Sequence, residues 1–542
     1  MLSYQTTGRH SSGAWRRAGS SPRLAVAVAM LAIAVLSLPA FAVPFLNDMD
    51  AYAHHADKIL RGGLLYRDTL DTKPPFVVLQ YALIFWAARG TSLAGVKLVT
   101  MAILGVSALV LRRLWSELFP SSPGGDLVLL LFVLASFCGW GEDFLSSNTE
   151  IPANLFILLG VWCMTSRGFA WQPGRLVLAG ALIGVAFLYR FQAGAPLAAY
   201  ALLVLCHRPG LSRGAARLAL LAVGFVVPAT ALVAYYAHVG ALDSLLLVVR
   251  LDYFYIRGAQ LYWPAAGLQV LTAVVSQAPI LALGLAEAVF ILRSRRWSTS
   301  EAFLLLYLAV SLVTFFVGKR FFAHYLIASI PPLVLLIARR LVRIRATAPS
   351  RPVGLLAFCQ QHAGALIAAY AAVFWVVNLG YFATRPPEPV YPNLARLAQA
   401  VTTREDPVFV WTTKTHLLFA IDRAFATRFV SNDFLVGRMY GTRHRLPTAT
   451  AESARPAAVA ELWPLLLHDL ERVKPRLIVD DTRETSQFTL DRYPELQAFV
   501  ERGYEPCRVV DGFCVYVRKG IRHGGASTPA SRPAPTPADT TS

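Results

Sequence analysis

Residues 216–238 of the chain have the sequence ARLALLAVGFVVPATALVAYYAH, in which Arg217 is the only side chain charged at neutral pH. The hydrocarbon core of a bilayer is about 30 Å thick, so a helix that crosses it needs roughly 20 consecutive apolar residues. A continuous helix also pairs its backbone N–H and C=O groups internally, which lipid cannot do for it. We therefore predict a transmembrane helix here, and the same pattern recurs along the chain.

The composition of the whole chain agrees with a membrane protein. Of 542 residues, 56% are hydrophobic and 15% are charged, whereas soluble domains average about 45–50% and about 25%. These values exclude a soluble enzyme, a disordered chain and a collagen-like repeat. The six cysteines are too few in so long a chain to form a disulfide framework. We predict a polytopic α-helical membrane protein.

Apolar runs of membrane-spanning length recur through the first two thirds of the sequence. Eleven transmembrane helices are predicted, near residues 24–44, 92–111, 126–141, 149–165, 174–190, 191–206, 216–238, 266–292, 301–317, 321–338 and 360–383. A further apolar run, Pro74–Ala88, has only about 15 residues and begins with two prolines. We predict that this run is a juxtamembrane helix that lies on the membrane surface.

The basic residues decide the orientation of the spans. With the N-terminus inside and Pro74–Ala88 lying flat, the inner loops hold 19 arginines and the outer loops hold 10 lysines and arginines. This asymmetry follows the positive-inside rule and predicts a multi-pass protein of the plasma (inner) membrane with a cytoplasmic N-terminus. Topology and attraction to anionic membrane lipids then explain the net charge of +19, so no nucleic-acid partner is expected. Lys97, near the outer start of the second span, is interpreted as an anchor at the lipid headgroups.

The region after the last span is predicted to be a small α/β domain on the outer face. Residues 408–411 and 477–479 have the pattern of buried strands, and residues 462–472 that of a helix. A hairpin is predicted over 507–517, turning at Asp511-Gly512. Four regions are therefore predicted: a cytoplasmic N-terminus at 1–23, a transmembrane catalytic domain at 24–383, an extracytoplasmic domain at 384–520 and a disordered tail at 521–542. The segment Pro386–Pro389 is predicted to be the linker between the transmembrane and extracytoplasmic domains.

Two cysteines, Cys507 and Cys514, fall within this hairpin. A disulfide between them would suit an outer domain, because disulfides persist in oxidising compartments. Adjacent strands give unfavourable geometry for such a bond when the two cysteines are not opposite each other. The sequence leaves both outcomes open.

The first outer loop carries the chemistry. Asp48 and Asp50 follow the first span directly, Tyr52 comes next, and Lys73 precedes Pro74-Pro75. Charges beside membrane spans are costly and often mark functional sites. A carboxylate at the low-dielectric membrane edge is suited to act as a base. The alternative is structural, with the aspartates as plain interface charges and Lys73 as a snorkelling anchor.

The order of motifs in this loop resembles that of the GT-C glycosyltransferases. The motifs are Asp-x-Asp-x-Tyr-Ala at 48–53, Gly-Gly-x-x-Tyr-Arg-Asp at 62–68 and Lys-Pro-Pro at 73–75. They look most like the dolichyl-phosphate-mannose–protein mannosyltransferase-like group, which includes the bacterial lipid A aminoarabinose transferases. Residues 148–150, 189–193 and 319–325 are similar to later family segments, so the resemblance covers residues from about 24 to about 520.

The resemblance implies an enzyme that moves a sugar from a polyprenyl-phosphate donor to a glycan, lipid or protein acceptor on the outer face. It implies that Asp48 is the general base and that Lys73 meets the donor phosphate. Asp50, two residues further on, is expected to orient the site rather than to take the proton. The leaving phosphate needs cations nearby. The outer-side cations at span ends are Lys73, Arg190, Lys319 and Arg320. The candidate substrate-binding residues are Tyr52, Glu142, Asp143, Glu150, His324 and Tyr325.

The cofactor requirement and the class of function have alternatives. Aminoarabinose transferases typically carry a glutamate before Lys-Pro-Pro that helps to hold a metal ion, whereas this chain has Thr72 at that position. The sequence therefore predicts no cofactor with certainty, and binding of a divalent metal ion is left open. Within enzymes, the alternative is a glycan ligase. Outside them, the alternatives are a transporter or flippase, or a non-catalytic cell-envelope assembly protein. A transporter would show inverted repeats, which the sequence lacks, and a scaffold would give Asp48 and Lys73 no role.

Overall fold

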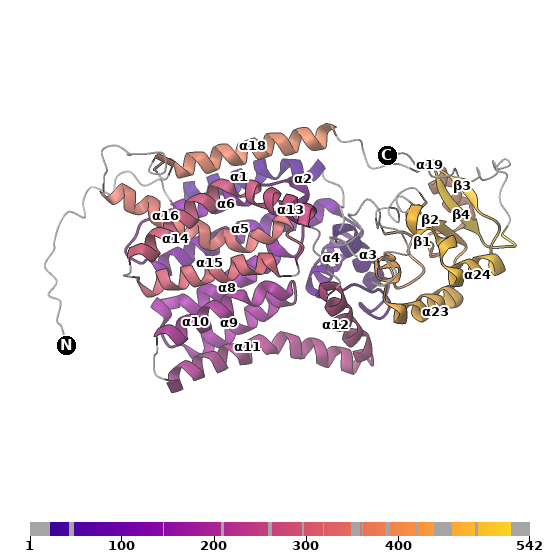
Figure 1. Ribbon diagram of the computed structural model, residues 1–542, viewed down its shortest axis with the longest axis horizontal. Coiled ribbons are helices and arrows are strands. Elements are labelled where there is room, and N and C mark those ends of the chain that lie inside the picture. Colours follow the sequence, from indigo (N-terminus) through magenta and orange to yellow (C-terminus); the bar gives the residue numbers. More distant parts are fainter. Residues whose placement is uncertain are drawn as a thin grey trace.

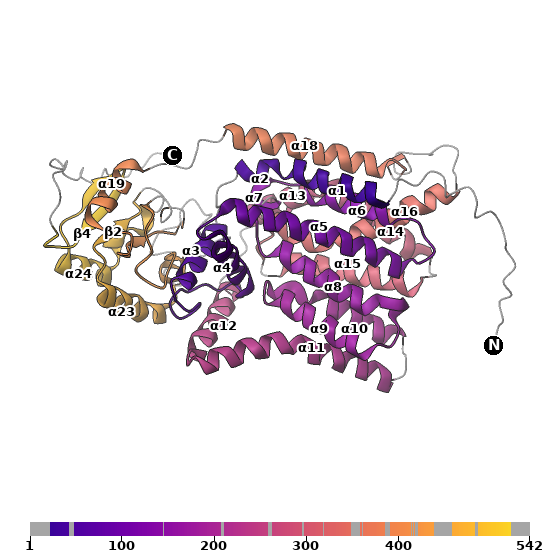
Figure 2. The ribbon, with the colours of Figure 1, turned by 180° about the vertical axis from the view of Figure 1, so that it is seen from behind.

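The computed structural model of the chain describes residues 22–42, 48–144, 146–207, 211–257, 263–294, 297–317, 319–347, 358–359, 361–384, 391–413, 415, 417, 421–437, 458–482 and 486–521. A large helical bundle and a smaller domain with a β-sheet lie side by side, with helices α3 and α4 between them (Figures 1 and 2). The predicted linker Pro386–Pro389, most of the N-terminal segment and nearly all of the tail lie outside the described residues.

The bundle is built from apolar helices that run roughly parallel to one another (Figure 1). Its described members are α1 (Pro22–Leu36), α2 (Leu38–Ala42), α5 (Leu93–Leu118), α6 (Gly125–Ser136), α8 (Glu150–Phe169), α9 (Pro173–Phe187), α10 (Ala195–His207), α11 (Leu211–His238), α13 (Trp263–Ser276), α14 (Ala278–Ser294), α15 (Thr299–Phe316), α16 (Ile330–Thr347) and α18 (Ala363–Thr384). Large apolar side chains such as Val226 and Val376 are exposed on its outside. Such a surface suits lipid rather than water.

Within the described residues, six helices are long and apolar enough to cross a membrane. They are Arg23–Phe41, Leu93–Leu118, Ser212–His238, Thr299–Phe316, Ala323–Ala346 and Ala363–Thr384. The bent pair α13 and α14 makes a seventh if it counts as one span, and α6, α9 and α10 are shorter apolar helices. The fold is therefore that of a polytopic helical membrane protein, whereas the number of eleven spans stays a prediction.

Two predicted spans are not continuous α-helices. The apolar run predicted as a span at 266–292 is broken into two helices, because the chain bends by 79° between α13 and α14. Gln277 lies at the break. There the Gln277 side-chain amide donates a hydrogen bond to the backbone carbonyl of Cys138, just after α6. The polar side chain at the bend thus has a partner inside the bundle. The span predicted at 321–338 begins with the 3-10 helix η2 (Ala323–Ser329) before α16 starts.

Small residues let α9 and α11 approach closely. A Cβ atom placed on Gly224 of α11 would lie 2.0 Å from the carbonyl oxygen of Val177, and one on Gly180 of α9 would lie 2.1 Å from that of Leu221. Glycine at such positions allows backbones to pack at short distance in membranes, where dispersion contacts drive helix association. The two helices therefore form a tightly packed pair within the bundle.

Several short elements gather at the end of the bundle that faces the β-sheet (Figures 1 and 2). They are α3 (Asp48–Leu60), α4 (Phe76–Ala88), α7 (Gly141–Phe144), η1 (Phe191–Gly194) and α12 (Leu242–Arg257). Helix α4 has 13 residues and is not among the spanning candidates. The shorter apolar helices α6, α9 and α10 are of similar length, so the surface position of Pro74–Ala88 stays a prediction.

The C-terminal part contains a four-stranded mixed sheet in the order β1-β2-β4-β3. Its strands are β1 (Phe409–Trp411), β2 (Leu477–Asp480), β3 (Arg508–Val510) and β4 (Phe513–Val517), and its helices include α19 (Pro392–Val401), α21 (Asp433–Val436), α23 (Trp463–Val473) and α24 (Pro494–Gly503). Strand β1 is parallel to β2, and the other pairs are antiparallel. The predicted strands, helix and hairpin are thereby confirmed. Both turn residues, Asp511 and Gly512, have positive φ, as a two-residue hairpin turn with matching twist requires.

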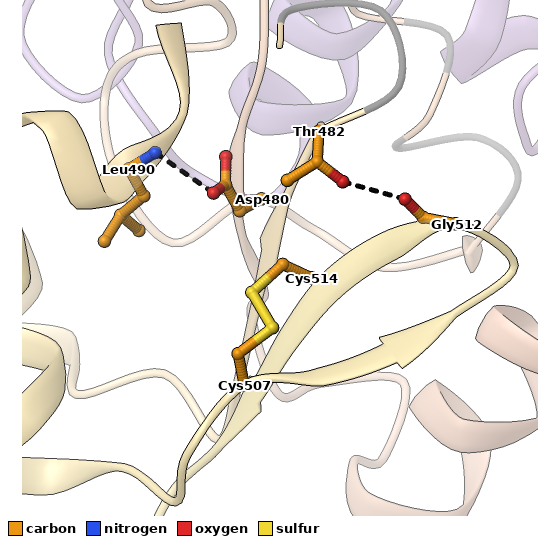
Figure 3. The surroundings of a disulfide bond; sticks show 6 residues. All are labelled: Asp480, Thr482, Leu490, Cys507, Gly512 and Cys514. Atoms are coloured by element: carbon orange, nitrogen blue, oxygen red, sulfur yellow. Dashed lines mark hydrogen bonds between the residues drawn. A yellow bond between two sulfur atoms is a disulfide. The ribbon is translucent and has the colours of Figure 1, made fainter. Parts of the chain in front are cut away.

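Cys507 and Cys514 form a disulfide that ties the start of β3 to β4 (Figure 3). The register pairs Cys514 with Val509 rather than with Cys507. The Cα atoms of the two cysteines are nevertheless 5.5 Å apart, which is within the usual range for a disulfide. The bond forms because Cys507 lies just before β3, outside the regular ladder.

The C-terminal domain contacts the predicted first outer loop, which carries Asp48 and Lys73, through backbone hydrogen bonds. The N–H of Leu70 donates to the carbonyl of Arg428 at 2.7 Å, and Leu70 forms a short parallel bridge with Phe429. The ring of His54 lies 3.1 Å from the carbonyl of Thr415. These contacts fix the loop between the bundle and the sheet.

Candidate active site

Asp48 and Lys73 form an ion pair at the end of the bundle. Asp48 is the first residue of α3, and Lys73 lies just before the two prolines that precede α4. The Lys73 ammonium is 3.1 Å from the Asp48 carboxylate, and the two side chains are 33% and 44% exposed. A carboxylate and an ammonium from opposite ends of the loop therefore meet at a place that a substrate can reach.

Tyr52 and Asp50 extend this pair along α3. The Tyr52 hydroxyl donates to Asp48 Oδ2 at 3.5 Å, one helical turn away. Burial and the negative charge of Asp48 raise the pKa of Tyr52 well above its ordinary value, so its hydroxyl keeps its proton. Asp50 is buried at 3% exposure, and its charge acts on Tyr81 of α4. Asp50 thus lies on the buried face of α3, where its side chain faces the protein interior rather than a substrate at the surface.

The backbone around Lys73 is held by residues that the sequence did not single out. The Tyr66 hydroxyl donates to the Lys73 carbonyl at 2.8 Å, and the Lys73 N–H donates to Asp71 at 3.1 Å. His55 of α3 lies between Asp71, at 3.4 Å, and Thr69, at 2.5 Å. Burial raises the pKa of Asp71, but the His55 hydrogen bond and the charges of His55 and Lys73 outweigh it and hold that pKa below the ordinary value.

A second cluster joins three of the predicted outer segments. Glu150 at the start of α8 forms an ion pair with Arg190 at 2.5 Å, and the His324 ring nitrogen is 3.7 Å from the same carboxylate oxygen. The Arg190 guanidinium lies over the Tyr325 ring at 4.2 Å, and its Nε donates to Gln192. Three segments that each resemble a family segment, around residues 150, 190 and 324, therefore meet in the structure.

Glu150, Arg190 and Gln192 also line a cavity between α8, α10 and α15, whose empty volume is about 380 Å³ with open solvent included. Four buried polar atoms of its lining residues have no hydrogen-bond partner among the described residues. They are Glu150 Oε2, Asn154 Oδ1, Arg190 Nη2 and the Tyr307 hydroxyl. Buried polar groups are normally satisfied by protein, water or ligand. These four atoms belong to residues that line the cavity, at the end of the bundle that carries Glu150 and Arg190.

The two groups of residues lie close enough to interact electrostatically. The charge of Lys73 acts on Glu150, and Tyr52 is influenced by both Lys73 and Glu150. Asp252 of α12 also interacts with Lys73, while burial raises the pKa of Asp252. The sequence analysis did not identify Asp252, because a single acidic residue between two predicted spans does not by itself indicate a functional site. Asp48, Tyr52, Lys73, Glu150 and Arg190 thus lie near one another at the same end of the bundle.

The remaining predicted residues have mixed outcomes. Arg320 is buried at 1% exposure, while its neighbour Lys319 is exposed. Glu142 and Asp143 lie in α7, but their side chains are outside the described residues. The interpretation of Lys97 as a headgroup anchor was wrong: the side chain is 2% exposed and lies 3.9 Å from the sulfur of Met49. It packs against α3 because Met49 faces the bundle.

The described residues do not supply a metal site. Within them, no group of three or more histidine, cysteine, aspartate or glutamate side chains is arranged to hold a metal ion. Thr72, which precedes Lys73, is buried at 7% exposure and has no carboxylate to offer. The donor set near Lys73 thus does not fit a divalent cation, and no chemical step below depends on one.

The fold is shared with solved membrane enzymes, although no family model and no curated protein sequence matches the chain. ArnT from Cupriavidus metallidurans bound to undecaprenyl phosphate is 15% identical, with a TM-score of 0.55 over 93% of this chain and 99% of that one. ArnT in the apo state is 16% identical, with a TM-score of 0.51 over 91% and 97%.

The oligosaccharyltransferase AglB from Archaeoglobus fulgidus, in complex with an inhibitory peptide and a dolichol-phosphate, gives a TM-score of 0.49 at 13% identity over 92% of this chain and 74% of that one. Identities this low establish the fold alone. The match to ArnT extends over nearly the full length of both chains. The chain therefore has the GT-C fold of these membrane glycosyltransferases.

Proposed function

We propose that this protein is a membrane glycosyltransferase that moves a sugar from a polyprenyl-phosphate donor to an acceptor on the outer face of the membrane. The observation that carries the proposal is the Asp48–Lys73 pair, 3.1 Å apart, at the outer helix ends of a GT-C fold. The solved ArnT that shares this fold was bound to undecaprenyl phosphate. A glycolipid, a polysaccharide or a protein is the acceptor class.

In the proposed reaction, Asp48 takes the proton of an acceptor hydroxyl as the oxygen attacks C1 of the donor sugar. The bond between C1 and the phosphate oxygen breaks, and its electron pair leaves with the polyprenyl phosphate. Lys73 stabilises the charge that develops on that phosphate, because a preorganised cation costs no reorganisation at the moment of transfer. Attack from the face opposite the phosphate inverts the configuration at C1.

The ion pair between the two residues suggests an order of events. Before the donor binds, the Lys73 ammonium lies 3.1 Å from the Asp48 carboxylate. The phosphodiester of the donor carries one negative charge, as the carboxylate does, and competes with Asp48 for Lys73. When the bond to C1 breaks, the leaving phosphate gains a second negative charge and binds the ammonium more strongly. The carboxylate would then be free to accept the proton of the acceptor. Donor binding would in this way prepare the base.

The Glu150–Arg190–His324 cluster is proposed as the second wall of the donor site. Arg190 is already paired with Glu150, so it contributes a fixed positive face rather than a mobile charge. Tyr325, stacked on Arg190 at 4.2 Å, restricts the guanidinium further. Arg320 and Lys319 follow in the same outer segment and are proposed to assist phosphate binding.

The proposed orientation places the C-terminal domain outside the cytoplasm of a plasma (inner) membrane. The Cys507–Cys514 disulfide supports this placement, because such bonds are rare in reducing compartments. The excess of arginines in the predicted inner loops gives the same orientation. The disulfide and the charge pattern are independent of each other, since they lie in different parts of the chain.

The function is tested by analysing the lipids and glycans of a strain that lacks the gene. We expect one sugar-linked polyprenyl phosphate to accumulate and one glycan to lose a single sugar residue. Restoring the parental gene should reverse both changes, whereas a gene encoding Asp48→Asn should not. Unchanged lipid and glycan profiles in the deletion strain, under conditions where the gene is expressed, would reject the proposal.

A further inference from the structure

A groove separates the first outer loop from the C-terminal domain. Its empty volume is about 860 Å³, with open solvent at its mouth included. One wall is the end of α3 and the turn that follows it. The other wall consists of residues 405–407 and 424–428 and of helix α23. Figures 1 and 2 show α3 beside this domain in both views. The groove lies outside the Asp48–Lys73 pair and is not used by the mechanism above.

Basic side chains outnumber acidic ones in this groove. The acidic residues that line it are Asp68, Glu405 and Asp469, and the basic residues are Lys58, Arg61, Arg67, Arg428 and Arg472. We call this site the basic groove. The wall thus carries five basic and three acidic side chains from the loop and the domain, and Arg61 is paired with Asp57, just outside the lining, at 2.7 Å.

Two of the three carboxylates are already engaged. Asp469 accepts hydrogen bonds from both the backbone and the guanidinium of Arg428 at 2.9 Å. Asp68 accepts from the Leu64 N–H at 2.8 Å and from Arg67 at 2.8 Å. These acids are therefore largely neutralised by their own partners. They have little capacity left to compensate the other cations.

Lys58 and Arg472 are the cations with the weakest compensation. Arg472 is 4.0 Å from Asp469, at the limit of an ion pair, and 64% exposed. Lys58 donates to the carbonyl of Phe425 at 3.5 Å and lies over its ring at 5.4 Å. Burial, together with the positive charges of Arg472 and Arg61, lowers the pKa of Lys58. An anionic ligand would give both side chains a charge-assisted hydrogen bond.

We propose that the basic groove binds a negatively charged part of the acceptor, namely a carboxylate or phosphate carried by an extended glycan. This inference rests on the proposed function, because it names the acceptor class of the same enzyme. Lys58 and Asp48 are ten residues apart on α3, which corresponds to roughly 15 Å along a helix. An acceptor that occupies both places is therefore longer than a single sugar.

The test measures binding of a labelled hexameric oligogalacturonate to the full-length protein in nanodiscs of neutral lipid. We expect binding that weakens as salt is added, because exposed charges are screened. The double variant Lys58→Gln/Arg472→Gln should bind at least about 10-fold more weakly, since each substitution removes a charge-assisted contact. Maltohexaose, which is neutral, should bind no better than background.

The matched control is Arg404→Gln/Arg502→Gln, which removes the same net charge. These two arginines pair with Asp422 and Glu471 on exposed parts of the same domain. The control should bind oligogalacturonate like the parent. Equal weakening in both double variants would overturn the inference, since it would reveal a non-specific charge effect. Tighter binding to phosphatidylglycerol vesicles than to oligogalacturonate, lost in the same variant, would overturn it in favour of a lipid surface.

A parallel arm separates this inference from the proposed function. Undecaprenyl phosphate binding is measured on the same preparations, with Lys73→Ala as the reference variant. If Lys73→Ala weakens that binding while the groove variant binds oligogalacturonate like the parent, only the inference fails. If undecaprenyl phosphate binds neither the parent nor any variant, the proposed function fails, and the groove loses its assignment as an acceptor site.

Discussion

At the scale of single residues, the site combines groups that the chain places far apart. Asp48 and Lys73 are 25 positions apart but 3.1 Å from each other, and Glu150 meets Arg190 and His324 from two further segments. The carboxylate that would accept a proton and the ammonium that would meet a phosphate are thus in contact. This arrangement predicts different effects for the loss of each charge.

Asp48→Asn tests the general base. The substitution keeps the shape of the side chain and removes its ability to accept a proton, so sugar transfer should fall by roughly 10²–10⁴-fold. Expression, thermal stability and undecaprenyl phosphate binding should remain near those of the parent. The control Asp57→Asn changes an exposed aspartate of the same helix that pairs with Arg61 and should transfer at the parental rate. A parental rate in purified Asp48→Asn would assign the base to another carboxylate.

Lys73→Ala tests the contact with the donor phosphate. A hydrogen bond to a charged group contributes about 1.5–3 kcal/mol, so donor affinity should fall by roughly 10- to 100-fold. Lys73→Arg should restore only part of it, because a planar guanidinium does not replace a point charge at the same place. Titration with undecaprenyl phosphate measures the effect, and Arg67→Ala in the same loop serves as the control. Parental affinity in Lys73→Ala would remove this residue from the site.

At the scale of elements, helix contacts depend on features that hydropathy does not report. The pair α9 and α11 packs through Gly180 and Gly224, where a Cβ atom has no room. The bend between α13 and α14 falls at Gln277, whose amide bonds to the Cys138 carbonyl. A hydropathy window detects the apolar runs in both places but reports neither the close contact nor the bend.

Gly224→Ala tests the close approach of α9 and α11. The new Cβ would lie 2.0 Å from the carbonyl oxygen of Val177, so the helices must separate and lose packing. We expect a lower unfolding temperature in detergent, at a cost of about 1–3 kcal/mol. Gly364→Ala in α18 is the control, because nothing lies within 4 Å of its new Cβ. Equal unfolding temperatures for Gly224→Ala and the parent would show that the pair tolerates wider spacing.

At the scale of the whole molecule, the C-terminal domain and the first outer loop form a continuous surface. Backbone bonding between Leu70 and Arg428 joins them, and Arg250 of α12 lies 3.3 Å from Glu461 of the domain. The loop that carries Asp48 and Lys73 is therefore in contact with the sheet domain. If the spans have the predicted orientation, this whole surface lies outside the cytoplasm.

Reporter fusions test that orientation. An alkaline phosphatase fused after Ala88 should be active, because this enzyme requires an oxidising compartment for its disulfides. The same reporter fused after Arg113 should be inactive, since α5 would have returned the chain to the cytoplasm. An active fusion after Arg113 together with an inactive one after Ala88 would show that Phe76–Ala88 crosses the membrane and would invert the later loops.

The sequence by itself determined the class of protein, the elements of the C-terminal sheet and the motif order of the first outer loop. These are local properties: apolar runs of bilayer length, alternating strands and a turn at Asp511-Gly512 follow from residue type and spacing. It also singled out Asp48, Lys73, Glu150 and Arg190, because charges are costly beside a membrane. Their catalytic and binding roles stay predictions.

Only the tertiary structure decided which of those charges meet. Contacts between distant segments bring Asp48 to Lys73 and His55 to Asp71. They also place Asp252 near Lys73 and bury Lys97. The same holds for the Cys507–Cys514 bond, since the path of the chain before β3 set the distance between the cysteines. Periodicity specifies which face of an element is buried, but the partner of each side chain is set by how whole helices and strands pack.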